Sequence, residues 1–172
     1  MPYYWAGNEP DIGAPWVYNF IGKPYMTQQI VHRIMAKEYF NAPGGLPGND
    51  DLGAMSSWYV WAAMGLYPEI PGVSGLVVSS PLFSRIVVDV PTGYDFKILA
   101  AHQGPYIQAA WLGKTPFPAS WITLGQLTNH TLAFDLGTSA NISWGSKKSD
   151  LPPSVAAGLT VGSVAKASSD SS

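Results

Sequence analysis

The chain has 172 residues, 47% of them hydrophobic, which is enough apolar material for one ordinary domain with a packed core. Charged residues make up only 12% and the formal net charge is −2, so there is no basic surface of the kind that neutralises phosphates, and a nucleic-acid partner is excluded. Cysteine is absent, which excludes disulfides, thiolate metal sites and a cysteine nucleophile.

The first third of the chain has the periodicity of helices. A segment from Ile12 to Phe20 ends at Gly22, and a second, from Thr27 to Phe40, carries apolar residues at three- and four-residue spacing with Thr27 as a plausible N-cap. A third, from Met55 to Met64, is apolar nearly all round, which predicts a helix buried on every side. Helices of this kind need further helices around them.

From Gly75 onward the period changes to that of strands, which predicts an antiparallel sheet or sandwich. The run from Leu112 to Pro116 is typical of a tight hairpin, with Gly113 supplying the positive φ angle. After about residue 150 the chain is rich in Pro, Ser, Ala and Gly, so we expect a disordered tail. The expected strands are Leu76–Ser79, Arg85–Val90, Phe96–Ala100, Ile107–Leu112, Thr131–Leu136 and Ala140–Trp144.

Two polar runs, Gly7–Asp11 and Gly48–Gly53, contain carboxylates among glycines. The second run leads directly into the third helix, so Asp50 and Asp51 stand at a helix N-terminus, where the macrodipole favours their ionised form. Such a carboxylate can act as a base or hold a cation. The plainer alternative, which the residues alone leave open, is that both aspartates only cap the helix.

Aromatic residues make up 13% of the chain and include seven Trp and nine Tyr. Trp5 and Trp16 flank the first polar run, so both are candidates for stacking on a sugar ring, whereas Trp58 lies within the third helix and is expected in the core. His102 and His130 fall in expected turns without a second histidine or a carboxylate at metal-ligand spacing, and they are given no role.

Several separated motifs together resemble the C-terminal part of glycoside hydrolase family 92, the calcium-dependent, exo-acting alpha-mannosidases. The likeness extends over about residues 4 to 145, with the motifs in the order of the family. The segments that carry it are Gly7–Pro10, Ala14–Asn19, Gly44–Val60, Gly65–Pro68 and Ser80–Phe83.

The resemblance implies a large enzyme with an N-terminal β-sandwich and an (α/α)6 barrel, which hydrolyses terminal alpha-linked mannose with inversion and takes part in carbohydrate metabolism and N-glycan processing. The expected fold class of this chain is then α+β. Residues 1–72 would be the last helices and the active-site loops of the barrel, residues 73–150 an antiparallel strand region, and residues 151–172 a disordered tail. The expected partners are mannose-containing glycans and the rest of the same enzyme, with no nucleic acid and no membrane.

The resemblance also implies roles for single residues. Asp51 matches the general base, Asp50 beside it would orient the base or bind sugar, and Asn49 would contact substrate. Asn8 and Glu9 match positions that bind sugar and calcium, which is the expected cofactor. The general acid of the family lies upstream of this motif, so this chain alone is expected to be catalytically incomplete.

Two other classes of function remain open at this point. The strand-rich half and the missing acid also fit a non-catalytic carbohydrate-binding or structural β-module, and the helical half fits another (α/α) barrel enzyme such as a glucosidase or phosphorylase. The family suggests a secreted protein, and the sequons at Asn129 and Asn141 fit a eukaryotic secretory route. No apolar run approaches the roughly 18 residues of a membrane-spanning helix.

Overall fold

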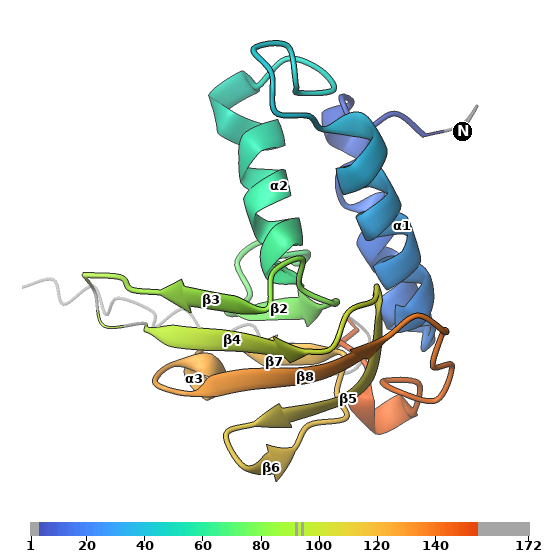
Figure 1. Cartoon of the computed structure of the whole chain (residues 1–172), viewed down its shortest axis with the longest axis vertical. Coiled ribbons are helices and arrows are strands. Elements are labelled where there is room, and N and C mark those ends of the chain that lie inside the picture. Colours follow the sequence, from blue (N-terminus) through green and yellow to red (C-terminus); the bar gives the residue numbers. More distant parts are fainter. Residues whose placement is uncertain (1–3, 92, 94, 155–172) are drawn as a thin grey trace, which may run out of the picture.

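The computed structural model describes residues 4–154 except 92 and 94, and it shows two helices that pack against each other above a layer of strands (Figure 1). Helix α1 is Pro24–Glu38, helix α2 is Ala54–Met64, and a single-turn helix α3 is Leu124–Leu127. Short 3₁₀ helices precede and follow them, at Glu9–Asp11, Ala14–Ile21, Asp51–Gly53 and Lys148–Asp150.

The strands form two sheets, so the α+β class expected from the sequence is confirmed. The smaller sheet is antiparallel in the order β1 (Leu66–Tyr67), β2 (Gly75–Val78), β7 (Trp121–Thr123). The larger has the order β3 (Arg85–Val88), β4 (Phe96–Ala101), β8 (Thr131–Gly137), β5 (Tyr106–Leu112), β6 (Thr115–Pro116). The wholly antiparallel sheet expected from the sequence was wrong here, because β8 pairs parallel to β4 after a long crossover connection.

The helix boundaries differ from the sequence prediction in two places. Helix α1 begins at Pro24 rather than after Thr27, because proline at the first helical position loses no hydrogen bond. Thr27 instead lies inside the helix, fully buried. The segment that ends at Gly22 is a 3₁₀ helix, and Gly22 closes it with a φ of 69°, as its position predicted.

The buried apolar residues form two cores. The helical core contains Val31, Ile34 and Met35 of α1, as the spacing predicted, together with Met55 and Trp58 of α2. The other core fills the space around the larger sheet, with residues such as Ile98, Ile107, Leu132 and Phe134. Helix α2 is less enclosed than its sequence suggests, because the side chain of Val60 is 57% exposed. No helix among the described residues has the length and apolar character to cross a bilayer.

Buried polar side chains join the helical part to the sheets. The Nδ2 group of Asn19 donates hydrogen bonds to the carbonyls of Val78 (2.9 Å) and Ser120 (3.0 Å). The Oε1 atom of Gln28 on α1 accepts from the backbone N–H of Ile107 on β5 (3.1 Å). Each pairing satisfies a buried backbone group, so it holds the helices at a fixed position on the strands.

Two local predictions in the C-terminal half had opposite outcomes. The hairpin is confirmed, with Gly113 at a φ of 61° between paired β5 and β6. The expected strand Ala140–Trp144 was wrong, because the side-chain oxygen of Asn141 accepts from the N–H groups of Ser143 and Trp144 and folds the segment into a turn. Most of the expected disordered tail, from residue 155, lies outside the described residues.

Candidate functional site

The structure brings the two polar loops into direct contact. A Cβ added to Gly48 would lie 2.8 Å from both Cα and O of Gly7, and one added to Gly7 would lie 2.6 Å from the carbonyl oxygen of Pro47. Only glycine allows so close an approach of two backbones. Trp58 of α2 fixes the first loop from the other side, because its Nε1 donates to the carbonyl of Ile12 at 2.9 Å.

Asp50 is held in place by the helix that follows it. Its Oδ1 accepts from the backbone N–H of Ser56 (2.9 Å) and its Oδ2 from the Ser56 hydroxyl (2.7 Å). These bonds, the backbone N–H first, hold the pKa of the Asp50 carboxyl below its usual range, so the group stays ionised. Both carboxylate oxygens are thus engaged in capping α2, which is the plainer of the two roles that the sequence left open for this residue.

Asp51 differs from its neighbour. It is exposed and opens a single 3₁₀ turn, and its carboxylate makes no hydrogen bond or ion pair with any described residue. The next two residues, Leu52 (φ 53°) and Gly53 (φ 79°), are both in the left-handed region. That conformation is costly for leucine, and such local strain clusters at functional sites. The loop therefore presents the Asp50 carboxylate, which is hydrogen-bonded to the helix, and the Asp51 carboxylate, which is not.

The first loop carries further oxygen atoms. Asn8 donates from its Nδ2 to the carboxylate of Asp11 at 2.9 Å, which leaves its amide oxygen available. Glu9 is exposed in the short 3₁₀ helix Glu9–Asp11, without a hydrogen bond to any described side chain. Asn49, on the second loop, is exposed as well.

Two tyrosines near the loops have raised pKa values. Burial raises the pKa of Tyr4, and Tyr39 and the carboxylate of Asp11 raise it further. Burial also raises the pKa of Tyr39, followed by the negative charge of Asp50. Both phenols therefore stay protonated at neutral pH.

The two tryptophans expected to stack on sugar are placed differently. Trp16 is fully buried, with Tyr67 stacked on its ring at 4.7 Å and Trp58 meeting it edge-on at 6.3 Å, so no face is left for a ligand and the prediction for it was wrong. Trp58 lies in the core, as expected. Trp5 is 56% exposed and lies against Gly7, at the point where the loops meet.

The described residues supply only part of a calcium site. The oxygens of Asn8 and Glu9 have the hard character that calcium prefers, but about six to eight such ligands are needed. Within the described part of the chain no group of three or more His, Cys, Asp or Glu side chains is arranged to hold a metal. These residues do not form a calcium site by themselves.

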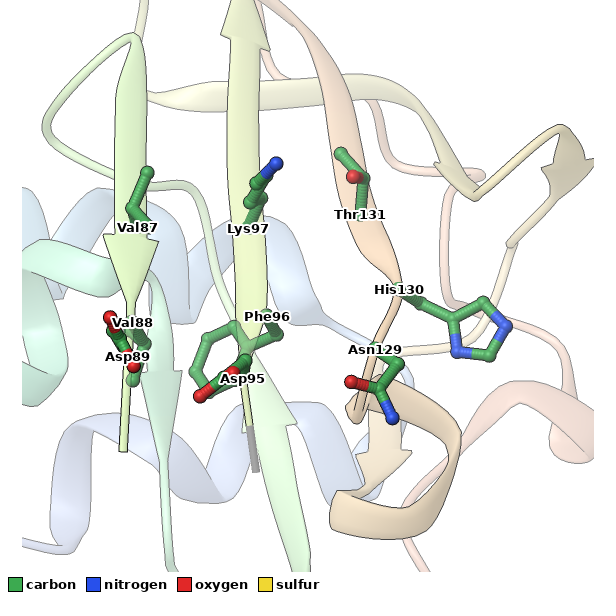
Figure 2. Close-up of a pocket in the computed structure, with 9 residues that line it drawn as sticks. All are labelled: Val87, Val88, Asp89, Asp95, Phe96, Lys97, Asn129, His130 and Thr131. Atoms are coloured by element: carbon green, nitrogen blue, oxygen red, sulfur yellow. The ribbon is translucent and has the colours of Figure 1, made fainter. Parts of the chain in front are cut away.

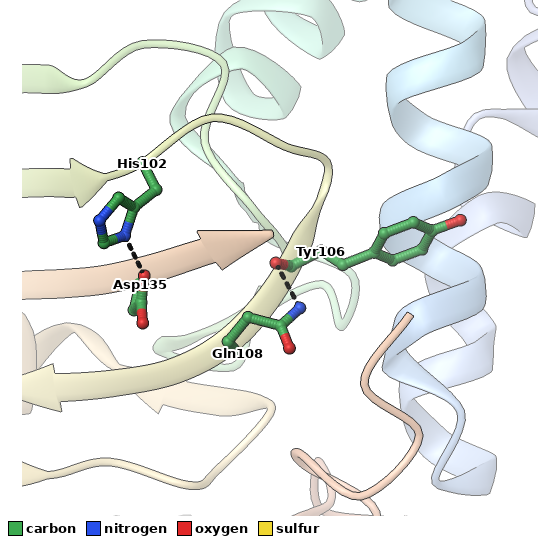
Figure 3. A network of polar contacts seen from close by, with 4 residues as sticks. All are labelled: His102, Tyr106, Gln108 and Asp135. Carbon is green, nitrogen blue, oxygen red and sulfur yellow. Dashed lines mark hydrogen bonds and ion pairs between the residues drawn. The ribbon is translucent and has the colours of Figure 1, made fainter. Parts of the chain in front are cut away.

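A second group of polar contacts, which no motif in the sequence predicted, lies on the larger sheet (Figure 3). His102 Nδ1 lies 2.6 Å from Asp135 Oδ1, and the side-chain amide of Gln108 donates from Nε2 to the carbonyl of Tyr106. The ion pair depends on the parallel pairing of β4 and β8, which sets Ala101 opposite Asp135. His102 is largely exposed and Asp135 partly exposed, so the pair contributes little stability.

The two acidic loops meet through glycines on an α+β scaffold. The model of the glycosyl hydrolase family 92 catalytic domain matches residues 1–138. The chain therefore belongs to glycosyl hydrolase family 92, as its motifs indicated.

Relatives agree with this assignment. A family 92 alpha-mannosidase from Bacteroides thetaiotaomicron, solved with mannoimidazole, superposes with a TM-score of 0.84 at 28% identity and covers 88% of this chain. An inverting family 92 mannosidase from the same organism gives 0.79 at 33% identity over 85% of the chain. A secreted glycosidase of Arthroderma benhamiae is 32% identical over 162 residues, 90% of the chain. The chain spans about a fifth of the length of each relative (20%, 20% and 21%).

Proposed function

We propose that the chain is the C-terminal part of an exo-acting, inverting alpha-mannosidase that removes terminal alpha-linked mannose from glycans, with Asp51 as its general base. The observation that carries the proposal is the backbone contact between the two glycine-containing loops, one of which carries the exposed Asp51 and the other Asn8 and Glu9. An alpha-mannosidase and an inverting mannosidase among the relatives support the substrate and the stereochemistry.

In this mechanism the Asp51 carboxylate takes a proton from a water molecule as that water attacks the anomeric carbon. A general acid from outside this chain protonates the leaving oxygen. The two carboxyl groups of an inverting enzyme stand about 6.5–9.5 Å apart to leave room for the water. Asp50, held by Ser56, keeps the loop in position and adds negative charge beside the base.

The other exposed groups would bind the sugar. Asn8, Glu9 and Asn49 can hydrogen-bond to ring hydroxyls, and the free face of Trp5 can stack on the apolar face of a pyranose. Calcium ligation by Asn8 and Glu9 belongs to the complete enzyme, where further oxygens would have to come from the rest of the polypeptide. Helices α1 and α2 would be two of the inner or outer helices of an (α/α)6 barrel, and the secreted fungal relative supports a secreted enzyme.

The test uses the full-length protein and an alpha-linked mannose disaccharide. Asp51→Asn should lower kcat by about 10²–10⁴-fold, the usual contribution of general-base catalysis. Asp89→Asn, an exposed aspartate beyond β3, is the matched control and should leave kcat unchanged. The first product should be beta-mannose, observed by NMR before mutarotation.

A second measurement separates loss of the base from loss of folding. With an activated aryl mannoside, azide should restore turnover to Asp51→Ala and give mannosyl azide of inverted configuration, because azide attacks without needing a proton acceptor. Full activity of Asp51→Asn, or the absence of azide rescue in Asp51→Ala, would reject Asp51 as the base. Binding of mannose with no turnover in the wild-type protein would favour a carbohydrate-binding module.

A further inference from the structure

The two sequons, Asn129-His130-Thr131 and Asn141-Ile142-Ser143, lie in very different surroundings. Asn141 uses both ends of its side chain. Its Nδ2 donates to the carbonyl of Gln108 on β5 at 3.0 Å, and its Oδ1 accepts from the N–H groups of Ser143 (3.0 Å) and Trp144 (3.3 Å). This turn places the ring of Trp144, which is only 7% exposed, in the sheet core.

A glycan on Asn141 would have to grow from the same nitrogen that bonds to β5. The amide is partly buried against that strand, so a sugar there would push the turn off the sheet and withdraw Trp144 from the core. A chain modified at Asn141 would therefore fold poorly.

Asn129 is the opposite case. It lies in the tight turn between α3 and β8 at a φ of 60°, a left-handed conformation that asparagine tolerates. Its backbone N–H donates to the carbonyl of Asp95 at 2.7 Å, which fixes the turn. Its side chain is exposed, and its amide makes no hydrogen bond with any described residue.

The space around Asn129 is open. A hollow of about 360 Å³ lies beside it, at the ends of β3 and β4, with Val87, Asp89 and Asp95 among its lining residues (Figure 2). The imidazole of His130 is held to the carbonyl of Thr128 through Nδ1 at 2.8 Å, and it points away from the strands. A first sugar on Asn129 therefore meets solvent and the rim of the hollow rather than packed side chains.

We propose that Asn129 is an N-glycosylation site of this protein and that Asn141 is a structural asparagine without a glycan. The inference rests on the proposed secretion, through a eukaryotic route. In the reaction the Asn129 Nδ2 attacks the anomeric carbon of an N-acetylglucosamine carried on a lipid diphosphate. The N–C bond forms, the bond from that carbon to the phosphate oxygen breaks, the lipid diphosphate leaves, and the amide loses one proton.

The test is glycopeptide mapping of the secreted full-length protein from yeast, after release of glycans by peptide N-glycosidase in ¹⁸O water, which marks each former glycan site as labelled aspartate. The wild-type protein should carry label at Asn129 and none at Asn141. Thr131→Ala removes the sequon while keeping Asn129, and Asn129→Asp keeps the left-handed turn, so both should lose this glycan alone. Ser143→Ala, the matched control, should leave the Asn129 glycan in place.

An unmodified Asn129 in the secreted wild-type protein, or a glycan on Asn141 in folded, secreted protein, would overturn the inference. Mannose release is measured on the same samples. Active enzyme without a glycan on Asn129 would reject the modification site and leave the catalytic proposal standing. Enzyme that is glycosylated on Asn129 but inactive would reject the catalytic proposal and support the modification site.

Discussion

Glu69 is a carboxyl group whose ionisation should weaken the fold. It follows β1 and lies against Gly13, where an added Cβ would be 2.8 Å from its Oε1. Its Oε2 is buried and has no hydrogen-bond partner among the described residues. Burial raises the pKa of Glu69 from 4.5 to about 7. The neutral form is therefore favoured in the folded state relative to the unfolded chain.

The pH dependence follows from the direction of this shift. Below about pH 4.5 the group is protonated in both states and costs nothing. Between about pH 4.5 and 7 only the unfolded chain loses the proton, so the free energy of unfolding falls across this window, and above pH 7 the full cost is present. A rise of about 2.5 pKa units corresponds to roughly 3.4 kcal/mol at most. Because the Glu69 side chain is only partly buried, we expect about 1.5–2 kcal/mol of destabilisation above pH 7.

The perturbation that tests this is Glu69→Gln, assayed by urea unfolding followed by circular dichroism at pH 4 and pH 8. The cost of burying the amide of the variant is the same at both pH values. The decisive quantity is therefore how much the difference in unfolding free energy between the variant and wild type changes from pH 4 to pH 8. We expect the variant to gain about 1.5–2 kcal/mol over wild type between pH 4 and pH 8, or about 3–8 °C in Tm. Glu9→Gln, at an exposed position, should show no such gain. Equal pH dependence of the Glu69 variant and wild type would refute the reasoning.

Three further substitutions test the loops. Asp50→Asn should lower the thermal stability at neutral pH, because Ser56 loses a charged acceptor. Since the fold lowers the pKa of Asp50, the difference in stability from wild type should disappear as the pH falls below that pKa. A difference that persists in acid would contradict this explanation. Gly48→Ala should separate the two loops by clashing with Gly7 and reduce kcat/KM by at least about tenfold, while a Gly44→Ala control, in open space, should be neutral in the same assay. Trp5→Ala should raise KM for mannosides with little change in Tm, and a large fall in Tm would show that the ring serves packing instead.

The features that the sequence predicted well are those set by neighbouring residues. The apolar spacing located helix α1, Gly22 ended the segment before it, and Gly113 marked the hairpin, because each depends on local periodicity or on a φ angle that only certain residues adopt easily. The family motifs were likewise local runs of residues. The errors arose where distant segments compete with local preference. The turn at Asn141 replaced an expected strand because its amide bonds to β5, which lies 33 residues away in the chain.

The candidate site also depends on segments that are distant in the sequence, and this dependence explains why residue type alone was a poor guide to a residue's role. Trp5 and Trp16 both flank the first polar loop, yet Tyr67 covers one and leaves the other exposed, a difference set by a strand some fifty residues further on. Asp50 and Asp51 are adjacent and chemically identical, yet the turn at Leu52 points only one of them at Ser56. A general base needs a carboxylate without a structural hydrogen bond, and a neighbouring carboxylate that is hydrogen-bonded within the fold can hold its loop in position. Which aspartate takes which part depends on where α2 begins rather than on the composition of the motif.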